Sequence, residues 1–268
     1  MLRAVPRRHT VIGLGVVAIV GVRLFGELHG RTVSRRPLSS TTSMPHFSGV
    51  DTYDAPGQHS ATLIFLHGLG DTSAGWAGEF RNLQRSMPHV RMVLPTAPIS
   101  PVTLNGGMRM TSWHDIHSLQ SIDSEKMAGL EESFAAIHEL IDDEVKRGIP
   151  SNRIVIGGFS QGAALSLYSG LQYKSPLAGI ISMSGYLPHY QTFATAKLSA
   201  ANKQTPVLVC HGQADPVVHF VAGKTTHEIL SRAGVPAQFK QYPGLGHGAN
   251  AQELNDVREF VTKAIPPL

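Results

Sequence analysis

The residues most suited to covalent chemistry surround Ser160, in the segment Gly158-Phe159-Ser160-Gln161-Gly162. This segment matches the pattern G-x-S-x-G and stands between a β-branched apolar run and an apolar pattern at helical spacing. In such a setting the glycines permit a tight turn, which exposes the serine Oγ and points the following N–H groups at a developing oxyanion. We therefore predict that Ser160 is a nucleophile. The alternative is a turn or N-cap serine without a chemical role.

Two later residues, Asp215 and His247, are of the types that a nucleophilic serine needs as orienting group and general base. Asp215 follows the apolar run PVLVCHG, and His247 lies in the loop GLGHG before the last helical segment. Taken singly, Asp215 could be a turn residue, and a chain with 14 histidines is expected to place one in a loop. Their order and their positions after separate strands favour a triad of Ser160, Asp215 and His247.

The oxyanion of such a reaction needs two N–H donors, and the sequence offers both. The backbone amide of Gln161 follows the nucleophile, and the loop His67-Gly68-Leu69-Gly70 follows an early strand. We assign the donors to the amides of Leu69 and Gln161. His67 is then predicted to be a structural residue beneath the loop rather than a second base.

Two histidine clusters could suggest a metal. One is His114, Asp115 and His117, and the other pairs His211 with Asp215. Neither has the spacing of an established metal-ligand set. We expect no metal and no cofactor.

The elements that position these residues are short apolar runs alternating with longer segments of helical period. The runs span residues 61–68, 90–98, 153–160, 177–185, 205–215 and 237–248, and the helical segments span 77–88, 123–148, 161–173, 219–234 and 250–265. This alternation predicts an α/β fold with a mostly parallel central sheet and helices on both faces. The acidic residues of segment 123–148, which include Glu131, Glu132 and Glu144, are expected on its solvated face.

The net charge of +4 is unevenly distributed along the chain of 268 residues. Residues 1–44 carry seven arginines and one acid, whereas the remainder carries 16 basic and 18 acidic residues. The predicted folded body therefore has no basic surplus that would indicate a nucleic-acid partner. A single cysteine, Cys210, excludes an internal disulfide.

Residues 1–44 are predicted to be an Arg-rich leader, and residues 45–268 a single catalytic domain. The apolar run 10–22 has 13 residues, fewer than the roughly 20 that span a bilayer. It fits a signal peptide or membrane anchor, and the Arg-rich, acid-poor start fits a mitochondrial presequence equally well. The alternative is a leader irrelevant to function, with a native start at Met44.

Five sequence blocks resemble the acyl-protein thioesterases, a family also described as lysophospholipases or small carboxylesterases. The blocks are FLHGLGDTSAGW, PTAPISPVTLNGGMRMTSWHDI, GGFSQGAALSLY, HGQADPVV and GLGHG. The resemblance implies an α/β-hydrolase without a large cap domain, a cytoplasmic catalytic domain and catalysis by Ser160, Asp215 and His247. The implied substrates are S-acylated proteins, lysophospholipids and simple aryl esters.

Residues 95–119 correspond to the loops that line the acyl groove in that family. Five apolar residues within them are our candidates for the groove: Val102, Leu104, Met108, Met110 and Trp113. Flexible methionines and an aromatic ring suit an alkyl chain. The alternative is ordinary packing beneath a long loop.

Three functions are compatible with these features. The leading one is hydrolysis of fatty acyl thioesters on palmitoylated proteins through an acyl-enzyme. A broad carboxylesterase or lysophospholipase would use the same chemistry. An inactive hydrolase fold that binds lipid is the third, although it would have no chemical need for the intact triad.

Overall fold

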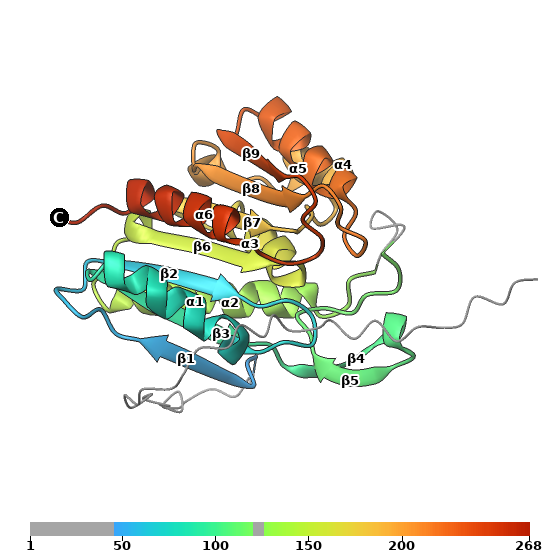
Figure 1. Cartoon of the computed structure of the whole chain (residues 1–268), viewed down its shortest axis with the longest axis horizontal. Helices are drawn as coiled ribbons and strands as arrows, with labels where there is room; N and C mark the ends of the chain where they lie inside the picture. The colour runs from blue at the N-terminus through green and yellow to red at the C-terminus, as the bar shows by residue number, and fades with distance from the viewer. Residues whose placement is uncertain (1–45, 120–125) are drawn as a thin grey trace, which may run out of the picture.

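The computed structural model describes residues 46–119 and 126–268 of the chain (Figure 1). The predicted leader, with its boundary at residue 44, lies outside these residues and stays a prediction. No helix in residues 46–119 and 126–268 combines the length and apolarity needed to cross a membrane.

A seven-stranded sheet forms the centre of the molecule, in the order β1-β3-β2-β6-β7-β8-β9. Only β1 runs antiparallel to its neighbour, and the remaining pairs are parallel. The strands are β1 (Gly49–Tyr53), β2 (Ala61–Leu66), β3 (Val90–Thr96), β6 (Ile154–Phe159), β7 (Gly179–Met183), β8 (Val207–Gly212) and β9 (Ala237–Tyr242). The predicted mostly parallel sheet is confirmed.

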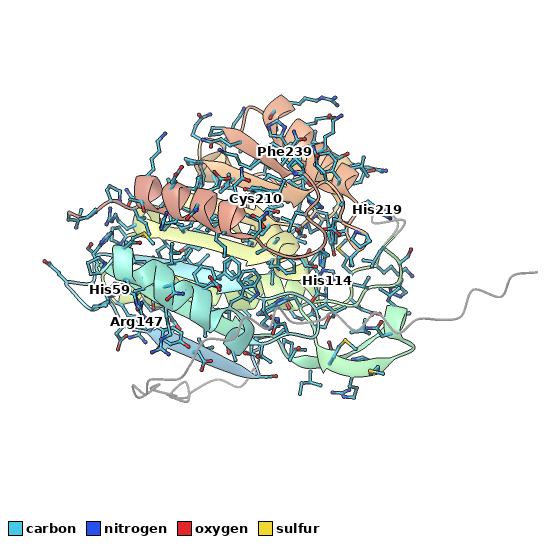
Figure 2. The ribbon with its side chains drawn as sticks, viewed as in Figure 1. His59, His114, Arg147, Cys210, His219 and Phe239 are labelled. Carbon is cyan, nitrogen blue, oxygen red and sulfur yellow. The ribbon has the colours of Figure 1, made fainter. Side chains whose placement is uncertain are left out.

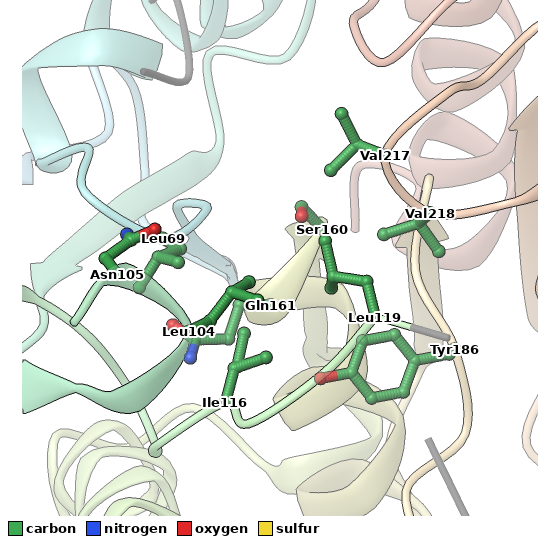
Figure 3. Close-up of a pocket in the computed structure, with 10 residues that line it drawn as sticks. All are labelled: Leu69, Leu104, Asn105, Ile116, Leu119, Ser160, Gln161, Tyr186, Val217 and Val218. Carbon is green, nitrogen blue, oxygen red and sulfur yellow. The ribbon is translucent and has the colours of Figure 1, made fainter. Parts of the chain in front are cut away.

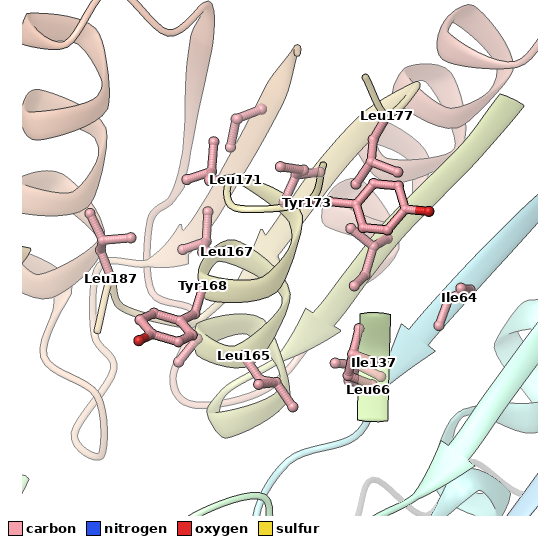
Figure 4. Close-up of a cluster of buried hydrophobic side chains, with 14 of the residues drawn as sticks. Ile64, Leu66, Ile137, Leu165, Leu167, Tyr168, Leu171, Tyr173, Leu177 and Leu187 are labelled. Atoms are coloured by element: carbon pink, nitrogen blue, oxygen red, sulfur yellow. The ribbon is translucent and has the colours of Figure 1, made fainter. Parts of the chain in front are cut away.

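Helices cover both faces of this sheet (Figure 1). They are α1 (Ser73–Ser86), α2 (Leu130–Lys146), α3 (Gln161–Gly170), α4 (Tyr190–Ala196), α5 (Phe220–Arg232) and α6 (Ala251–Ala264). Alternate residues of β2 show how the faces divide. Ile64 and Leu66 belong to the core beneath α2 and α3 (Figure 4), whereas Leu63 and Phe65 pack with α1 and α6. A strand buried on both faces reads as a continuous apolar run, which is why the sequence predicted it.

Two features of the sheet region were not predicted as strands. The edge strand β1 is polar and only half buried, so it lacks an apolar run. A separate two-stranded hairpin, β4 (Ile99–Val102) with β5 (Met108–Thr111), occupies the stretch that we expected to line an acyl groove.

The expectation that all acids of α2 lie on a solvated face is wrong for Glu144. Its side chain is buried, and it accepts a hydrogen bond from Thr62 Oγ1 at 2.8 Å. Arg91 and Arg147 lie 3.5 and 3.4 Å from its carboxylate. Arg91 on β3 and Arg147 at the end of α2 compensate the buried charge, and the helical periodicity of α2 alone could not reveal the contact with Arg91.

Candidate active site

The turn between β6 and α3 carries Ser160 in a strained backbone conformation. Its φ of 54° and ψ of −118° lie in a region that non-glycine residues rarely adopt. The Ser160 amide donates to the carbonyl of Met183 on β7 at 2.8 Å, which anchors the turn to the sheet. A Cβ added at Gly158 would lie 2.4 Å from the backbone of Gly162, and one at Gly162 would lie 2.3 Å from Leu66 O. Strand and helix can approach this closely only because both positions are glycine.

The structure brings Ser160, His247 and Asp215 together from three different loops. His247 Nε2 lies 3.0 Å from Ser160 Oγ, and His247 Nδ1 lies 2.8 Å from Asp215 Oδ2. With Asp215 ionised, Nδ1–H donates to the carboxylate, which leaves Nε2 free to accept the serine proton. This is the geometry that a general base beside a nucleophile requires.

Asp215 is held as a carboxylate although it is almost entirely buried. Its Oδ1 accepts from the amides of Val217 and Val218 at 2.8 and 3.0 Å. Burial alone would raise the pKa of Asp215. The hydrogen-bonding partners His211, His247 and the Val217 amide outweigh burial and hold this pKa well below its usual range.

The two predicted oxyanion donors, Leu69 and Gln161, line one pocket together with Ser160. Neither backbone amide donates a hydrogen bond within the part of the chain that the structure describes. Gln161 is also the first residue of α3, so the positive end of a helix dipole faces the same space. Their role as oxyanion donors remains our proposal.

The side chain of Gln161 connects the Ser160 turn to the segment that follows β5. Its Oε1 accepts from Trp113 N at 2.9 Å, and its Nε2 donates to His114 O at 2.7 Å and to Ser112 Oγ at 3.0 Å. The amide group is thus fully engaged in buried hydrogen bonds. These bonds fix the position of the Gln161 backbone relative to residues 112–114.

His67 has the structural position that the sequence suggested. Its Nε2 accepts from Ala97 N at 3.0 Å, so Nδ1 carries the proton and donates to Gly68 O at 2.6 Å. The ring is buried against Trp113, and this burial lowers the pKa of His67. A neutral imidazole with both nitrogens occupied supports the loop that carries Leu69.

The pocket beside Ser160 has mainly apolar walls contributed by several loops (Figure 3). It is lined by Leu69, Leu104, Asn105, Ile116, Leu119, Ser160, Gln161, Tyr186, Val217 and Val218, and we call it the Ser160 pocket. Among the predicted groove residues, Leu104 lines it directly. Val102 and Met110 belong to the small apolar cluster that also contains Leu69 and Leu104.

The other two candidates, Trp113 and Met108, lie outside both the Ser160 pocket and this cluster. Trp113 is 1% exposed and belongs to the core, where its Nε1 donates to His67 O at 2.8 Å. Met108 is 54% exposed on β5. An apolar residue in a long loop can face the core, the solvent or a ligand, and the sequence alone did not distinguish these cases.

Sequence reasoning missed most of the pocket lining. Val217 and Val218 come two and three residues after Asp215, so their nearness to a predicted catalytic residue in the sequence could have indicated them. Tyr186 follows β7 just as Asp215 follows β8, at the same edge of the sheet. Asn105, Ile116 and Leu119 lie within residues 95–119, the segment that we expected to line the groove, but they were not among the five candidates chosen there.

The two histidine clusters do not form metal sites within residues 46–119 and 126–268. His114 Nδ1 lies 2.9 Å from Asp115 O and its Nε2 lies 3.3 Å from Tyr186 Oη, and burial lowers the pKa of His114 to about 4. The Asp115 carboxylate instead accepts from the amide and hydroxyl of Thr103 at 2.7 and 2.6 Å.

Comparison with known proteins places these features in a family context. The family model described as phospholipase/carboxylesterase matches residues 52–265. An acyl-protein thioesterase 1 from Neurospora crassa is 44% identical over 79% of this chain and 90% of its own length. An acyl-protein thioesterase 1 homolog from Dictyostelium discoideum is also 44% identical, over 78% of this chain and 92% of its own.

Two solved structures are similar to this chain in fold and in sequence. The crystal structure of Arabidopsis thaliana SOBER1 has a TM-score of 0.72 and 32% identity, over 77% of this chain and 99% of that one. Zea mays acyl-protein thioesterase 2 has a TM-score of 0.70 and 31% identity, over 81% of this chain and 98% of that one.

Proposed function

This chain belongs to the phospholipase/carboxylesterase family of α/β-hydrolases, and on that premise we propose that it removes fatty acyl groups from S-acylated cysteines of proteins. The observation that carries the proposal is the hydrogen-bonded Ser160, His247 and Asp215 beside an apolar pocket. Relatives named acyl-protein thioesterase, at 40–44% identity over most of their length, support the substrate class.

The first half of the reaction acylates Ser160. His247 Nε2 takes the hydroxyl proton while Oγ bonds to the thioester carbonyl carbon, and the Asp215 carboxylate stabilises the resulting imidazolium. The amides of Leu69 and Gln161 stabilise the oxyanion, where loss of one donor typically costs roughly 3 kcal/mol. The carbon–sulfur bond then breaks. The cysteine leaves as a thiolate, since its conjugate acid has a pKa of about 8.5 and needs little protonation.

The second half releases the fatty acid. The departing thiolate first takes the proton from His247 Nε2, which restores the neutral imidazole. Water then enters in the place of the thiol, gives a proton to Nε2, and bonds through its oxygen to the acyl carbon. The bond from this carbon to Ser160 Oγ then breaks, and the proton returns from His247 to Oγ. The acyl chain is bound in the Ser160 pocket during both halves, because its walls are mainly apolar.

A second candidate is a broad carboxylesterase or lysophospholipase, which the family description favours. The same three residues would cleave an oxyester, with His247 protonating the leaving alkoxide. The two candidates therefore differ in substrate and not in catalytic machinery.

The function is tested in two steps. A fluorophosphonate probe should label the folded wild-type chain and leave the Ser160→Ala variant unlabelled; a wild-type chain that stays unlabelled would favour the inactive lipid-binding module. Turnover of a palmitoylated-cysteine peptide, a lysophospholipid and a short aryl ester is then compared. The proposal expects the highest kcat/KM on the palmitoylated peptide, and an equal or better value on the short ester would contradict it.

We further propose that residues 1–44 target the catalytic domain or anchor it to a membrane, on the basis of their arginines and apolar run. N-terminal sequencing of the native protein tests this proposal. A native chain that begins at Met44 would overturn it.

A further inference from the structure

His211, near the end of β8, is a buried side chain that the proposed mechanism does not use. Its Nε2 lies 2.8 Å from the carbonyl oxygen of Val218 and 3.5 Å from Asp215 Oδ2. Both neighbours are hydrogen-bond acceptors, so Nε2 carries a proton. The N–H donates to Val218 O and also lies against the carboxylate that orients His247.

The acceptors of His211 belong to one short turn, residues 215–218. Asp215 Oδ1 closes this turn by accepting from the amides of Val217 and Val218. Val217 and Val218 line the Ser160 pocket (Figure 3). The turn therefore joins the carboxylate to a wall of the pocket, and the His211–Val218 hydrogen bond fixes it from beneath.

The other ring nitrogen of His211, Nδ1, indicates that the imidazole does more than fill space in the core. With Nε2 protonated, Nδ1 is an acceptor, and it has no hydrogen-bond partner in the described part of the chain. A buried polar atom without a partner costs free energy. An apolar side chain would avoid that cost, so what the imidazole adds at this position is its Nε2–H.

Helix α5 provides the space for this ring at Gly223. A Cβ added at Gly223 would lie 2.4 Å from His211 Nδ1. The Phe220 ring, at the start of the same helix, lies edge-on to the imidazole with centroids 6.1 Å apart. The ring is thus held between α5 and the 215–218 turn.

We propose that His211 is a positioning residue for the 215–218 turn. Its Nε2–H directs the Asp215 carboxylate at His247 and, through Val218, keeps the pocket wall in line with Ser160 Oγ. This inference rests on the proposed acyl-hydrolase function and adds to it, because it couples acyl-chain binding to the orientation of the triad.

Two variants of similar side-chain length separate the hydrogen bond from packing. His211→Gln keeps a donor near the Nε2 position, whereas His211→Met has none. We measure kcat and KM on acetylated and palmitoylated cysteine peptides, per active site titrated with a fluorophosphonate. His211→Met should lose about 10-fold or more in kcat on both peptides, and its KM should rise several-fold on the palmitoyl peptide alone. His211→Gln should stay within about threefold of wild type in kcat and KM.

A substitution on α5 provides a second way to displace the His211 ring. Gly223→Ala should reproduce the His211→Met defect, because the new Cβ displaces the imidazole. Gly78→Ala is the matched control, since a Cβ at this helical glycine would meet nothing within 4 Å. The double variant His211→Met with Gly223→Ala should be little worse than either single variant, because both remove one interaction.

The inference is overturned if His211→Met and His211→Gln have equal kcat per titrated site and equal KM on both peptides. It is also overturned if His211→Met only reduces the titrated fraction, as a purely structural residue would. A labelled wild-type chain that does not cleave the palmitoyl peptide defeats the proposed function instead. The His211 comparison is then decided on short-chain and long-chain aryl esters.

Discussion

At the scale of single residues, the proposed chemistry depends on how the structure sets the protonation state of each side chain. Asp215 remains ionised in a buried position because several donors converge on its carboxylate. This charge fixes the tautomer of His247 and leaves Nε2 facing Ser160. The positive φ of Ser160 contributes to this geometry, because the strained backbone points Oγ toward His247.

Replacement of the base tests this assignment directly. His247→Ala should lower kcat/KM by about a thousandfold or more, because among the described residues His247 alone is hydrogen-bonded to Ser160 Oγ and can take its proton. Steady-state kinetics on any cleaved ester measures the loss. His219→Ala, at an exposed position outside the Ser160 pocket (Figure 2), is the control and should have the kcat/KM of wild type. A loss of only tenfold for His247→Ala would mean that another histidine is the base.

Glu253 is a second residue whose protonation the fold alters. It lies in the first turn of α6, is fully buried, and neither carboxyl oxygen has a hydrogen bond of ordinary geometry within the described residues. Burial, together with the nearby Asp256 and Asp215 carboxylates, raises the pKa of Glu253 from 4.5 to about 8. The folded chain therefore holds a neutral carboxylic acid at neutral pH.

This shift makes the free energy of unfolding depend on pH. Between pH 4.5 and about 8 the unfolded chain releases the Glu253 proton and the folded chain keeps it, so stability falls over this range and then levels off. Glu253→Gln removes the effect. It should match wild type near pH 4.5 and be more stable near pH 8 by on the order of a few kcal/mol in chemical denaturation.

The control for this prediction is Glu259→Gln, an exposed acid on the same helix. Its unfolding curve should follow wild type across the whole pH range. An equal stability difference between Glu253→Gln and wild type at pH 5 and pH 8 would contradict a raised pKa.

At the scale of elements, the decisive contact is the approach of α3 to β2 beneath Ser160. The backbone of Gly162 packs against the carbonyl of Leu66, so the helix start is fixed relative to the strand that leads to Leu69. The Gln161 side chain attaches the same helix start to residues 112–114. The two proposed oxyanion donors are thereby held on rigid neighbouring elements.

A methyl group at this contact should separate the two elements. Gly162→Ala places a Cβ 2.3 Å from Leu66 O, and we expect a loss of about 1–3 kcal/mol in the free energy of unfolding. The Gln161 amide should also shift, with a fall of about 10-fold or more in kcat per titrated site. Gly248→Ala is the matched control, because a Cβ there would meet nothing within 4 Å. A fully stable and active Gly162→Ala variant would contradict this account.

At the scale of the whole molecule, the parallel sheet brings distant parts of the chain to one edge. Leu69 follows β2, Ser160 follows β6, Asp215 follows β8 and His247 follows β9. Carboxyl ends of parallel strands share one edge, so these loops meet although Leu69 and His247 are 178 positions apart in the sequence. The segment from β4 to Leu119 closes one side of the Ser160 pocket.

The site residues all lie within the span that the family model matches, residues 52–265. A chain that begins at Met44 should therefore retain kcat/KM on small esters and the melting temperature of the full chain. Parallel kinetics and thermal unfolding of both chains measure this. A shortened chain that is soluble but tenfold slower would place the leader within the catalytic body.

The sequence predicted the sheet, most helices and the order of the three triad candidates, because each rests on a local signal. Apolar runs indicate strands that are buried on both faces, and the G-x-S-x-G pattern indicates a tight turn that only glycines permit. It did not predict β1 or the β4–β5 hairpin, whose residues are polar or half exposed. It also did not reveal that Trp113 and Glu144 are buried and that Met108 is exposed, because their surroundings come from elements distant in the chain.

The sequence by itself determined the proposed reaction type, since residue identity and chain order specify which groups can attack, accept a proton and orient. Only the tertiary structure decided which side chains form the Ser160 pocket and what holds Asp215. Val217, Val218, Tyr186 and His211 acquire their places through contacts between loops at one edge of the sheet. Periodicity along a segment reports whether it is buried, but it carries no information about which distant segment covers it.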